Sequence, residues 1–94
     1  MSTGFATVRF WAGARAAAGT AEVLVPVPPG CTVATLTELV LAQVPGTGGA
    51  GALARVIASC SVLVGDTPLG TRDPAEVEVP PGETVEYLPP FAGG

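Results

Sequence analysis

The sequence predicts an α+β fold in which a mixed β-sheet packs on one main helix. Residues 5–11 and 84–88 alternate apolar and polar side chains, which is the period of a half-buried strand. Residues 33–44 carry apolar side chains at helical spacing, with a threonine before them and a proline after them. At 94 residues the chain has room for a single hydrophobic core, so we expect one domain.

The first two strands are predicted to form a hairpin. Residues 5–11 place three apolar side chains on one side, namely Ala6, Val8 and Phe10. Residues 13–19 consist mostly of glycine and alanine, and we interpret them as a small-residue connection. Residues 22–27 form the second strand, with one apolar face made of Val23, Val25 and Val27. Because Pro26 has no N–H to donate, this strand is expected at an edge of the sheet.

The main helix is predicted to follow a turn at residues 28–30, with Thr32 as its N-cap, and to stop at Pro45. Its apolar positions are Val33, Leu36, Leu39, Val40 and Val44. Thr35 and Glu38 also have the spacing of a capping box, so a start one turn later stays open.

The remaining predicted elements are short. Residues 46–51 are rich in glycine and predict a loop, which is no phosphate-binding motif because no lysine follows it. In chain order, we then expect a helical segment at 53–57, a third strand at 60–64, a turn at Gly65 and Asp66, a short return segment from Pro68, a turn or minor strand at 76–79, and a last strand at 84–88 with Val85 and Tyr87 facing inward.

The order of these elements predicts the topology. Placing the last strand parallel to the first and beside it satisfies the preference for right-handed crossovers and leaves residues 22–27 at the edge. A mixed sheet of this kind packed on one helix is the β-grasp, or ubiquitin-like, fold. We therefore expect a β-grasp domain over residues 1–88 and a flexible C-terminal tail over residues 89–94.

The composition excludes several classes of catalyst. The chain has neither histidine nor lysine, so serine–histidine and cysteine–histidine catalysis are ruled out. Cys31 and Cys60 lie too far apart for a metal knuckle and are too few for an iron–sulfur cluster. We interpret them as buried thiols without an assigned role, and we expect no metal site and no permanently bound cofactor.

The charge pattern bears on the partners and the compartment. The net charge is -4, and the cations are Arg9, Arg15, Arg55 and Arg72, so no basic patch for nucleic acid is expected. The acidic side chains would suit docking on a basic partner surface, or serve solubility alone. No apolar stretch is long enough to predict a membrane span and no signal-peptide pattern is present, so we expect a cytoplasmic protein without membrane contact.

The printed sequence closes on Pro89-Pro90-Phe91-Ala92-Gly93-Gly94. Glycine has no Cβ, so Gly93 and Gly94 could run through a narrow channel and bring a carboxylate into a partner's active site. From Pro90 an extended chain reaches about 14 Å, enough to cross the wall of such a partner. The two prolines lower the cost of ordering the tail, and Phe91 either anchors it in a partner's groove or packs back on the domain. We therefore expect partner-binding residues at Pro89, Pro90, Phe91 and Ala92.

Three segments are specific enough to be compared with known families, namely residues 8–15, residues 31–33 and residues 82–94. The last is the most diagnostic, because a short strand, a double proline and an apolar residue precede Gly93-Gly94. On these segments the chain resembles the MoaD/ThiS family of bacterial sulfur carriers over nearly its whole length. The resemblance is greatest to the small subunits of molybdopterin synthase (MoaD).

The resemblance implies a two-stage cycle. An adenylating, MoeB/ThiF-like activating enzyme would use ATP to adenylate the Gly94 carboxylate, and a sulfur donor protein would convert it to a thiocarboxylate. In the molybdopterin branch the sulfur goes to cyclic pyranopterin monophosphate on a MoaE-like large subunit, which forms a heterotetramer with two small subunits. The chain itself would be a non-catalytic sulfur carrier in molybdenum cofactor biosynthesis.

Three other functions stay open. The same thiocarboxylate could serve cysteine, thiamine thiazole or specialised-metabolite biosynthesis, because the partner selects the acceptor. The chain could be a ubiquitin-like protein modifier joined through Gly94 to lysines of other proteins, although without lysine it could not build chains on its own side chains. The last alternative is a plain interaction module whose Gly-Gly end is incidental.

Overall fold

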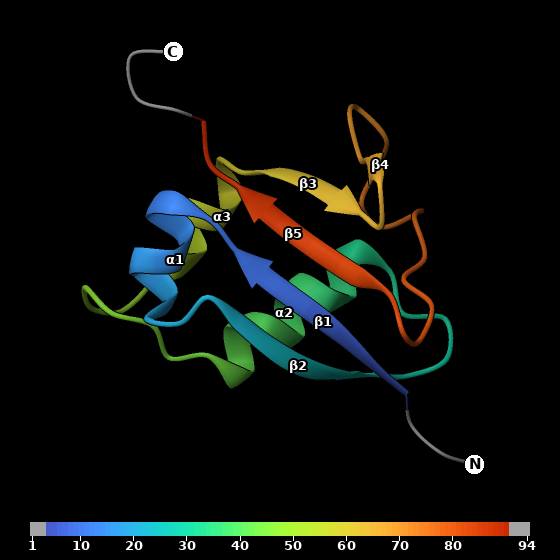
Figure 1. The fold of residues 1–94 in the computed structure, drawn as a ribbon, viewed down its shortest axis with the longest axis horizontal. Helices are drawn as coiled ribbons and strands as arrows, with labels where there is room; N and C mark the ends of the chain where they lie inside the picture. Colours follow the sequence, from blue (N-terminus) through green and yellow to red (C-terminus); the bar gives the residue numbers. More distant parts are fainter. Residues whose placement is uncertain (1–3, 91–94) are drawn as a thin grey trace.

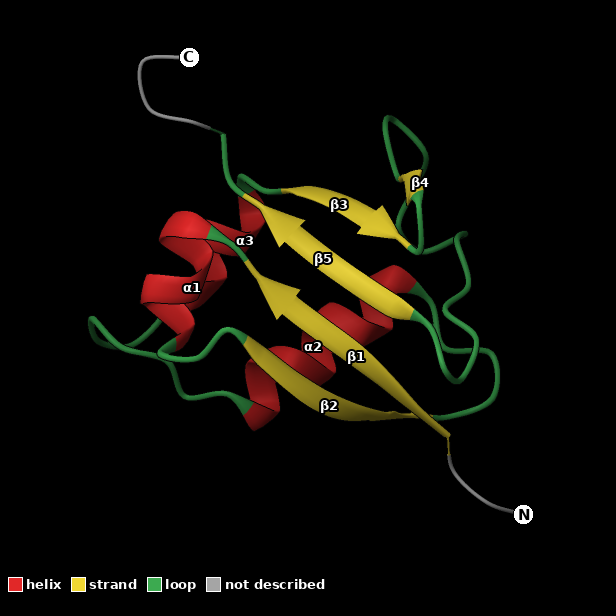
Figure 2. Cartoon of the chain, in the orientation of Figure 1, coloured by secondary structure: helices red, strands yellow, loops and turns green. Residues whose placement is uncertain are grey.

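One mixed β-sheet with helices on one of its faces makes up residues 4–90, the part of the chain that the computed structural model describes (Figure 1). Helix α2 crosses the sheet on that face, and α1 and α3 pack against each other near the end of β1 (Figures 1 and 2). The elements are β1 (Gly4–Phe10), α1 (Ala12–Ala18), β2 (Glu22–Val27), α2 (Val33–Gln43), α3 (Ala52–Ala58), β3 (Ser61–Val64), β4 (Thr67–Pro68) and β5 (Thr84–Leu88).

The strand order is β2-β1-β5-β3-β4. Strand β5 pairs in parallel with β1 and antiparallel with β3, while β1 and β2 form an antiparallel hairpin. This confirms the β-grasp topology and the parallel placement of the last strand beside the first. It also confirms that β2, which contains Pro26, lies at an edge, where the missing N–H of proline breaks no ladder bond.

The core lies between the sheet and the helices, as the alternation predicts. In β5 the inward side chains Val85 and Tyr87 are 0% and 1% exposed. Tyr87 stacks on Phe10 of the neighbouring strand, with 6.1 Å between ring centroids. Its hydroxyl lies 2.8 Å from Oγ1 of Thr37 in α2. Strand β5 is therefore tied to the helix layer by packing and by one buried polar contact.

Helix α2 begins and ends where its capping residues predict. The N–H of Thr35 donates to Oγ1 of Thr32 at 3.2 Å, so Thr32 is the N-cap and the later start at Thr35 is not used. The C-cap is Val44, and Pro45 follows it. Its buried side chains are Val33, Leu36 and Val40, with Leu39 partly buried beside them.

The prediction for residues 13–19 is wrong, because this connection is helix α1. Alanine has the highest helix propensity, and Ala14 and Ala18 bury the same face one turn apart. Gly19 ends the helix at φ 79°, where its N–H donates to the carbonyl oxygen of Arg15 at 2.9 Å. Only two side chains of this segment are buried, so the sequence shows no apolar periodicity that would reveal it.

The short elements agree with prediction more closely. The segments predicted at 53–57 and 60–64 are α3 and β3, and the return segment from Pro68 is the two-residue strand β4. The turn or minor strand predicted at 76–79 is a single bridge between Thr32 and Glu78. No helix within residues 4–90 has the length and the apolar character that crossing a bilayer demands.

Candidate functional site

The sequence predicts six site residues, and the structure describes two of them. Pro89 is half-buried and Pro90 is exposed, directly after the end of β5. The predictions for Phe91, Ala92, Gly93 and Gly94 lie outside the described residues, as does most of the predicted tail over residues 89–94. The structural question is therefore what holds the root of this segment and which surfaces surround it.

The root of the tail, by which we mean Leu88 and Pro89, is held on several sides. Leu88, the last residue of β5, is paired with Ser61 of β3. On the other side of β5, the N–H of Trp11 donates to the carbonyl oxygen of Tyr87 at 3.2 Å. A Cβ placed on Gly13 of α1 would lie 4.0 Å from Cγ of Pro89, so the first proline sits against the start of that helix. Leu88 and Pro89 are therefore fixed at the end of a strand that lies between β1 and β3 (Figure 1).

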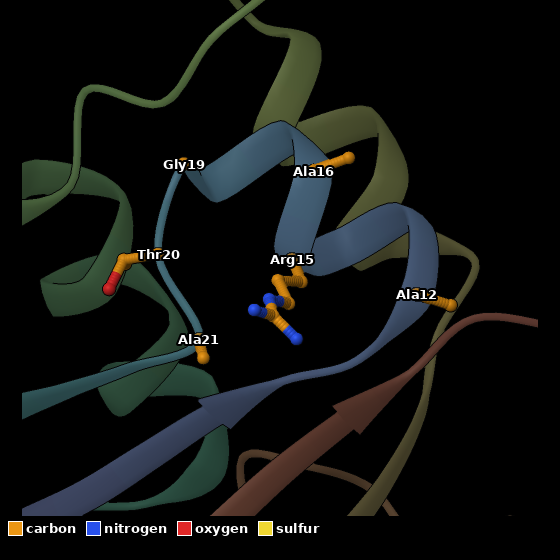
Figure 3. A pocket seen from close by; sticks show the side chains of 6 residues that line it. All are labelled: Ala12, Arg15, Ala16, Gly19, Thr20 and Ala21. Atoms are coloured by element: carbon orange, nitrogen blue, oxygen red, sulfur yellow. The ribbon is translucent and has the colours of Figure 1, made fainter.

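Two adjoining hollows lie beside this root, between α1 and the chain that enters β2. The larger, about 350 Å³, is lined by Ala12, Arg15, Ala16, Gly19, Thr20 and Ala21 (Figure 3). The smaller, about 90 Å³, shares Ala12, Arg15 and Ala21 and adds Arg9, Phe10 and Trp11. We call the two together the α1 groove. Its lining has no carboxylate, thiol or imidazole, so it offers no side chain for acid–base catalysis.

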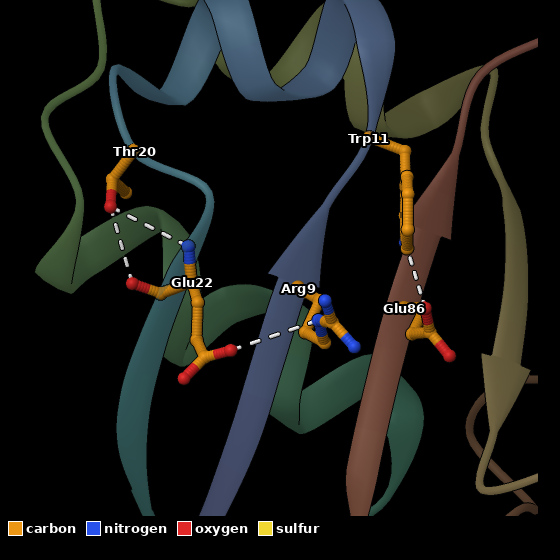
Figure 4. Close-up of polar contacts among 5 residues, drawn as sticks. All are labelled: Arg9, Trp11, Thr20, Glu22 and Glu86. Atoms are coloured by element: carbon orange, nitrogen blue, oxygen red, sulfur yellow. Dashed lines mark hydrogen bonds and ion pairs between the residues drawn. The ribbon is translucent and has the colours of Figure 1, made fainter.

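We call the face of the sheet opposite the helices the open face. A chain of polar contacts between side chains of β1, β2 and β5 and Trp11 crosses it (Figure 4). Arg9 of β1 lies opposite Glu22 of β2 and Glu86 of β5 in the strand registers. Its Nε is 3.7 Å from Oε1 of Glu22, and its guanidinium lies 5.3 Å from the centroid of the Trp11 ring. The Trp11 indole N–H in turn donates to Oε1 of Glu86 at 2.7 Å. These contacts hold the indole ring against the sheet, next to the root of the tail.

These polar contacts add little to stability because they are solvated. The side chains of Arg9 and Glu22 are 47% and 56% exposed, and ion pairs of this kind contribute about 0–1 kcal/mol. A cation–π contact at an exposed site adds about 0.5–1 kcal/mol. Their effect is mainly to orient Trp11, which is 42% exposed.

Large apolar side chains are exposed on the same face. Phe5 and Leu24 are 50% and 58% exposed, and they point away from the core because their neighbours Ala6 and Val25 point into it. Pro26 lies opposite Phe5 in the hairpin. Exposed aromatic and aliphatic residues with an arginine between them are typical of a surface that binds another protein.

The cysteines and the buried tyrosine are poor candidates for chemistry. Cys31 is buried and Cys60 half-buried, and burial raises the pKa of both thiols above the ordinary 9.0. A raised pKa disfavours the thiolate, which is the nucleophilic form. Burial likewise raises the pKa of Tyr87 to about 12. Among the residues described, no group of histidine, cysteine and acidic side chains has the arrangement of a metal site.

Sequence reasoning missed the open face as a candidate site. Trp11 and Arg9 fall inside the segment that resembles the sulfur carriers, but nothing in the linear sequence connects them to Glu86. A signal was available in the predicted parallel pairing of the first and last strands, which places the outward residues of the two strands side by side.

Neither the scan against protein-family models nor the search of curated protein sequences finds a match to this chain. Solved structures do match. The crystal structure of SAMP1 from Haloferax volcanii has a TM-score of 0.76 at 22% identity, over 97% of this chain and all of that one. The solution structure of small archaeal modifier protein 1 from Methanosarcina acetivorans has a TM-score of 0.74 at 21% identity, and that of Urm1 from Trypanosoma brucei 0.69 at 20%, both over the full length of the two chains compared. These similarities establish the ubiquitin-like β-grasp fold.

Proposed function

We propose that this protein is a sulfur carrier and the small subunit of a molybdopterin synthase. The observation that carries the proposal is the position of the motif Pro89-Pro90-Phe91-Ala92-Gly93-Gly94, which continues directly from β5. Strand β5 lies between β1 and β3, so the domain holds the start of this motif rigidly. A rigid root lets a partner that grips the domain also determine where the following residues go.

The chemistry takes place at Gly94 and on the partners. A MoeB/ThiF-like activating enzyme joins the Gly94 carboxylate to AMP from ATP and releases pyrophosphate. A carboxylate is a poor electrophile, whereas the acyl adenylate has a good leaving group, so the terminal sulfur of a persulfide on a donor protein attacks the acyl carbon and AMP departs. A thiol then reduces the resulting acyl disulfide, which releases the Gly94 thiocarboxylate and leaves a disulfide. The resulting thiocarboxylate then supplies sulfur to cyclic pyranopterin monophosphate on a MoaE-like large subunit, in a heterotetramer.

The side chains of the domain support a binding role in this scheme. The thiols of Cys31 and Cys60 have raised pKa values, and the α1 groove has no acid–base group. We therefore propose that the domain is non-catalytic and that the open face, with Trp11 beside the root of the tail, is held by the partners. Because the scheme consumes ATP and depends on other proteins, we place it in the cytoplasm.

The test is the intact mass of the protein after incubation with its activating enzyme, ATP and a sulfur source. The expected result is a gain equal to the exchange of one oxygen for sulfur. A matched chain that lacks Gly93 and Gly94 serves as the control, and it should show no gain. An unchanged mass of the full-length chain, with an activating enzyme proven active on another carrier, contradicts the proposal. Adding the large subunit and its pterin substrate then distinguishes molybdopterin synthesis from the cysteine, thiazole and specialised-metabolite pathways.

A protein modifier is the second candidate function, favoured by the similarity to proteins named small archaeal modifier protein 1. In that case Gly94 would form amide bonds with lysines of other proteins. Denaturing gels of cell extract, probed with an antibody against this protein, would then show a ladder of larger species that disappears when Gly93 and Gly94 are removed. A single band in both samples contradicts the modifier function.

A further inference from the structure

We propose that the α1 groove binds a carboxylate side chain, glutamate or aspartate, of a partner protein that holds the domain beside its tail. Arg15 would be the residue that pairs with this carboxylate. The inference rests on the proposed function in one respect only, that a protein partner grips this end of the domain. To the proposed function it adds a second contact with the partner, an ion pair that lies outside the tail.

The first observation is the unpaired charge of Arg15. Within residues 4–90 its guanidinium makes no hydrogen bond and no ion pair, and it lies in the opening between α1 and Ala21 (Figure 3). Arg9 differs, since Glu22 and the Trp11 ring engage it. Arg72 differs as well, because it donates to the carbonyl oxygens of Leu69 and Pro68. Arg55 of α3 likewise has no partner among the described residues, but it lines neither hollow. Arg15 is thus the cation within a hollow whose charge no described side chain balances.

The second observation is the surrounding charge. The protein carries a net charge of -4, yet no acidic side chain lines either hollow. The acid-rich segment 73–78 lies at the opposite end of the molecule from α1 (Figure 1). Glu22 already pairs with Arg9, and Glu86 accepts from Trp11, so among the lining residues Arg15 is the cation without a carboxylate partner. Charge complementarity therefore favours an anionic occupant beside Arg15.

The third observation is the apolar lining, which distinguishes a carboxylate side chain from a free anion. Most of the residues that line the larger hollow have no polar side chain, among them Ala12, Ala16 and Ala21 (Figure 3). The methylenes of a glutamate can pack on such walls while its carboxylate meets the planar guanidinium, which suits paired hydrogen bonds.

Three backbone amides beside the groove are not free to bind a phosphate. The N–H groups of Ala14 and Arg15 donate to the carbonyl oxygen of Trp11 at 2.9 and 3.3 Å. The N–H of Gly19 donates to the carbonyl oxygen of Arg15. Phosphate sites are commonly built from several free N–H groups that converge on the anion, and here these donors already have partners.

One end of the groove lies near the root of the tail. Ala12, which lines both hollows, precedes Gly13, whose position faces Pro89. Ala12 adopts φ 47°, a left-handed conformation that costs free energy for a residue other than glycine. Such strain is found where the surrounding structure determines the backbone, as at binding sites. A partner that receives the residues after Pro90 would therefore reach Arg15 with the same surface.

The experiment is a titration of the ¹⁵N-labelled protein, followed by NMR, with the capped peptide acetyl-Gly-Glu-Gly-amide. We expect saturable shifts confined to the amides of residues 12–21 and to the Nε–H of Arg15. The glutamine version of the peptide should cause no saturable shift. In Arg15→Gln the apparent affinity should fall at least tenfold, whereas Arg55→Gln, which removes the same charge from α3, should keep the affinity of the unchanged protein.

Three results would overturn the proposal. One is equal binding to Arg15→Gln and to the unchanged protein, and another is the absence of any saturable shift. The third is inorganic phosphate, at matched ionic strength, giving the same shifts with higher affinity, which would identify a phosphate site. None of these three binding results depends on thiocarboxylate formation, so failure of the carboxylate-binding proposal leaves the proposed function unaffected.

Discussion

Replacing Tyr87 with phenylalanine should change both the stability of the protein and its dependence on pH. Thr37 has a single hydroxyl proton, which it donates to the carbonyl oxygen of Val33 at 2.9 Å. The 2.8 Å contact between the two hydroxyls therefore has Tyr87 as the donor. Tyr87→Phe removes one hydrogen bond but leaves Thr37 bonded to Val33. We expect the free energy of unfolding at pH 7 to fall by about 1 kcal/mol.

The difference between the two proteins should disappear at alkaline pH. Burial raises the pKa of Tyr87 from 10.0 to about 12, so the unfolded chain loses the phenolic proton first. The stabilisation that depends on the neutral phenol is complete below pH 10 and is lost as the pH rises from 10 through 12. At pH 11 the unfolded phenol is mostly ionised and the folded one mostly neutral, which costs the unchanged protein about 1.4 kcal/mol. The phenylalanine variant lacks this loss, so the two proteins should be about equally stable near pH 11.

The assay is urea unfolding at several pH values from 7 to 11, followed by circular dichroism. Both proteins contain Cys31 and Cys60, whose pKa values are also raised, so the loss due to the thiols themselves is common to both. Only the repulsion between the thiolates and the Tyr87 phenolate, which also raises the pKa of Tyr87, is absent from the variant. The difference between the two curves therefore isolates Tyr87. An alkaline loss in Tyr87→Phe as steep as that of the unchanged protein would show that the phenol is not buried in the way described.

Three further changes test the tail, the open face and the main helix. Gly94→Ala should leave the unfolding curve unchanged and slow sulfur delivery in a reconstituted synthase at least tenfold, because a methyl group would stand on the carbon next to the reacting carboxyl carbon. Normal delivery would refute the narrow channel. Trp11→Ala should weaken binding to the activating enzyme about 30-fold, the loss expected of a central aromatic anchor, and change stability by less than about 1 kcal/mol. Arg55→Ala, which truncates an exposed side chain of α3 away from that face, is its control, and equal losses in a binding titration would remove the special role of Trp11. Thr32→Ala should lower the free energy of unfolding by about 1 kcal/mol through loss of the N-cap; an unchanged urea midpoint would mean that α2 does not depend on this cap.

Local patterns predicted most of the elements because each has a strong local cause. Thr32 and Pro45 bound α2, and alternation identifies β1, β2 and β5. Helix α1 was not predicted because its buried face consists only of Ala14 and Ala18, and two alanines give too weak a hydrophobic pattern to show a helical period. Its stability comes instead from alanine propensity, from the Gly19 C-cap and from packing beside α3.

The candidate site also has one part that the sequence predicts and another that only the fold reveals. The motif from Pro89 to Gly94 is a property of the linear sequence and needs no fold to be seen. The contacts of Arg9, Trp11 and Glu86 require residues from two strands that are 75 positions apart, brought together by a parallel pairing. The α1 groove depends on a helix that the sequence did not reveal, so its unpaired Arg15 could not be located beforehand.

By itself, the sequence determined the order of the strands and of α2 and α3, the inward faces of β1, β2 and β5, and the chemistry that Gly93 and Gly94 offer, because these follow from side-chain type and spacing along one chain. Only the tertiary structure decided which outward residues of β1, β2 and β5 meet, and that α1 forms a groove beside the root of the tail. These features arise from strand register and helix packing, which join residues distant in sequence and leave no periodic signal in either segment alone.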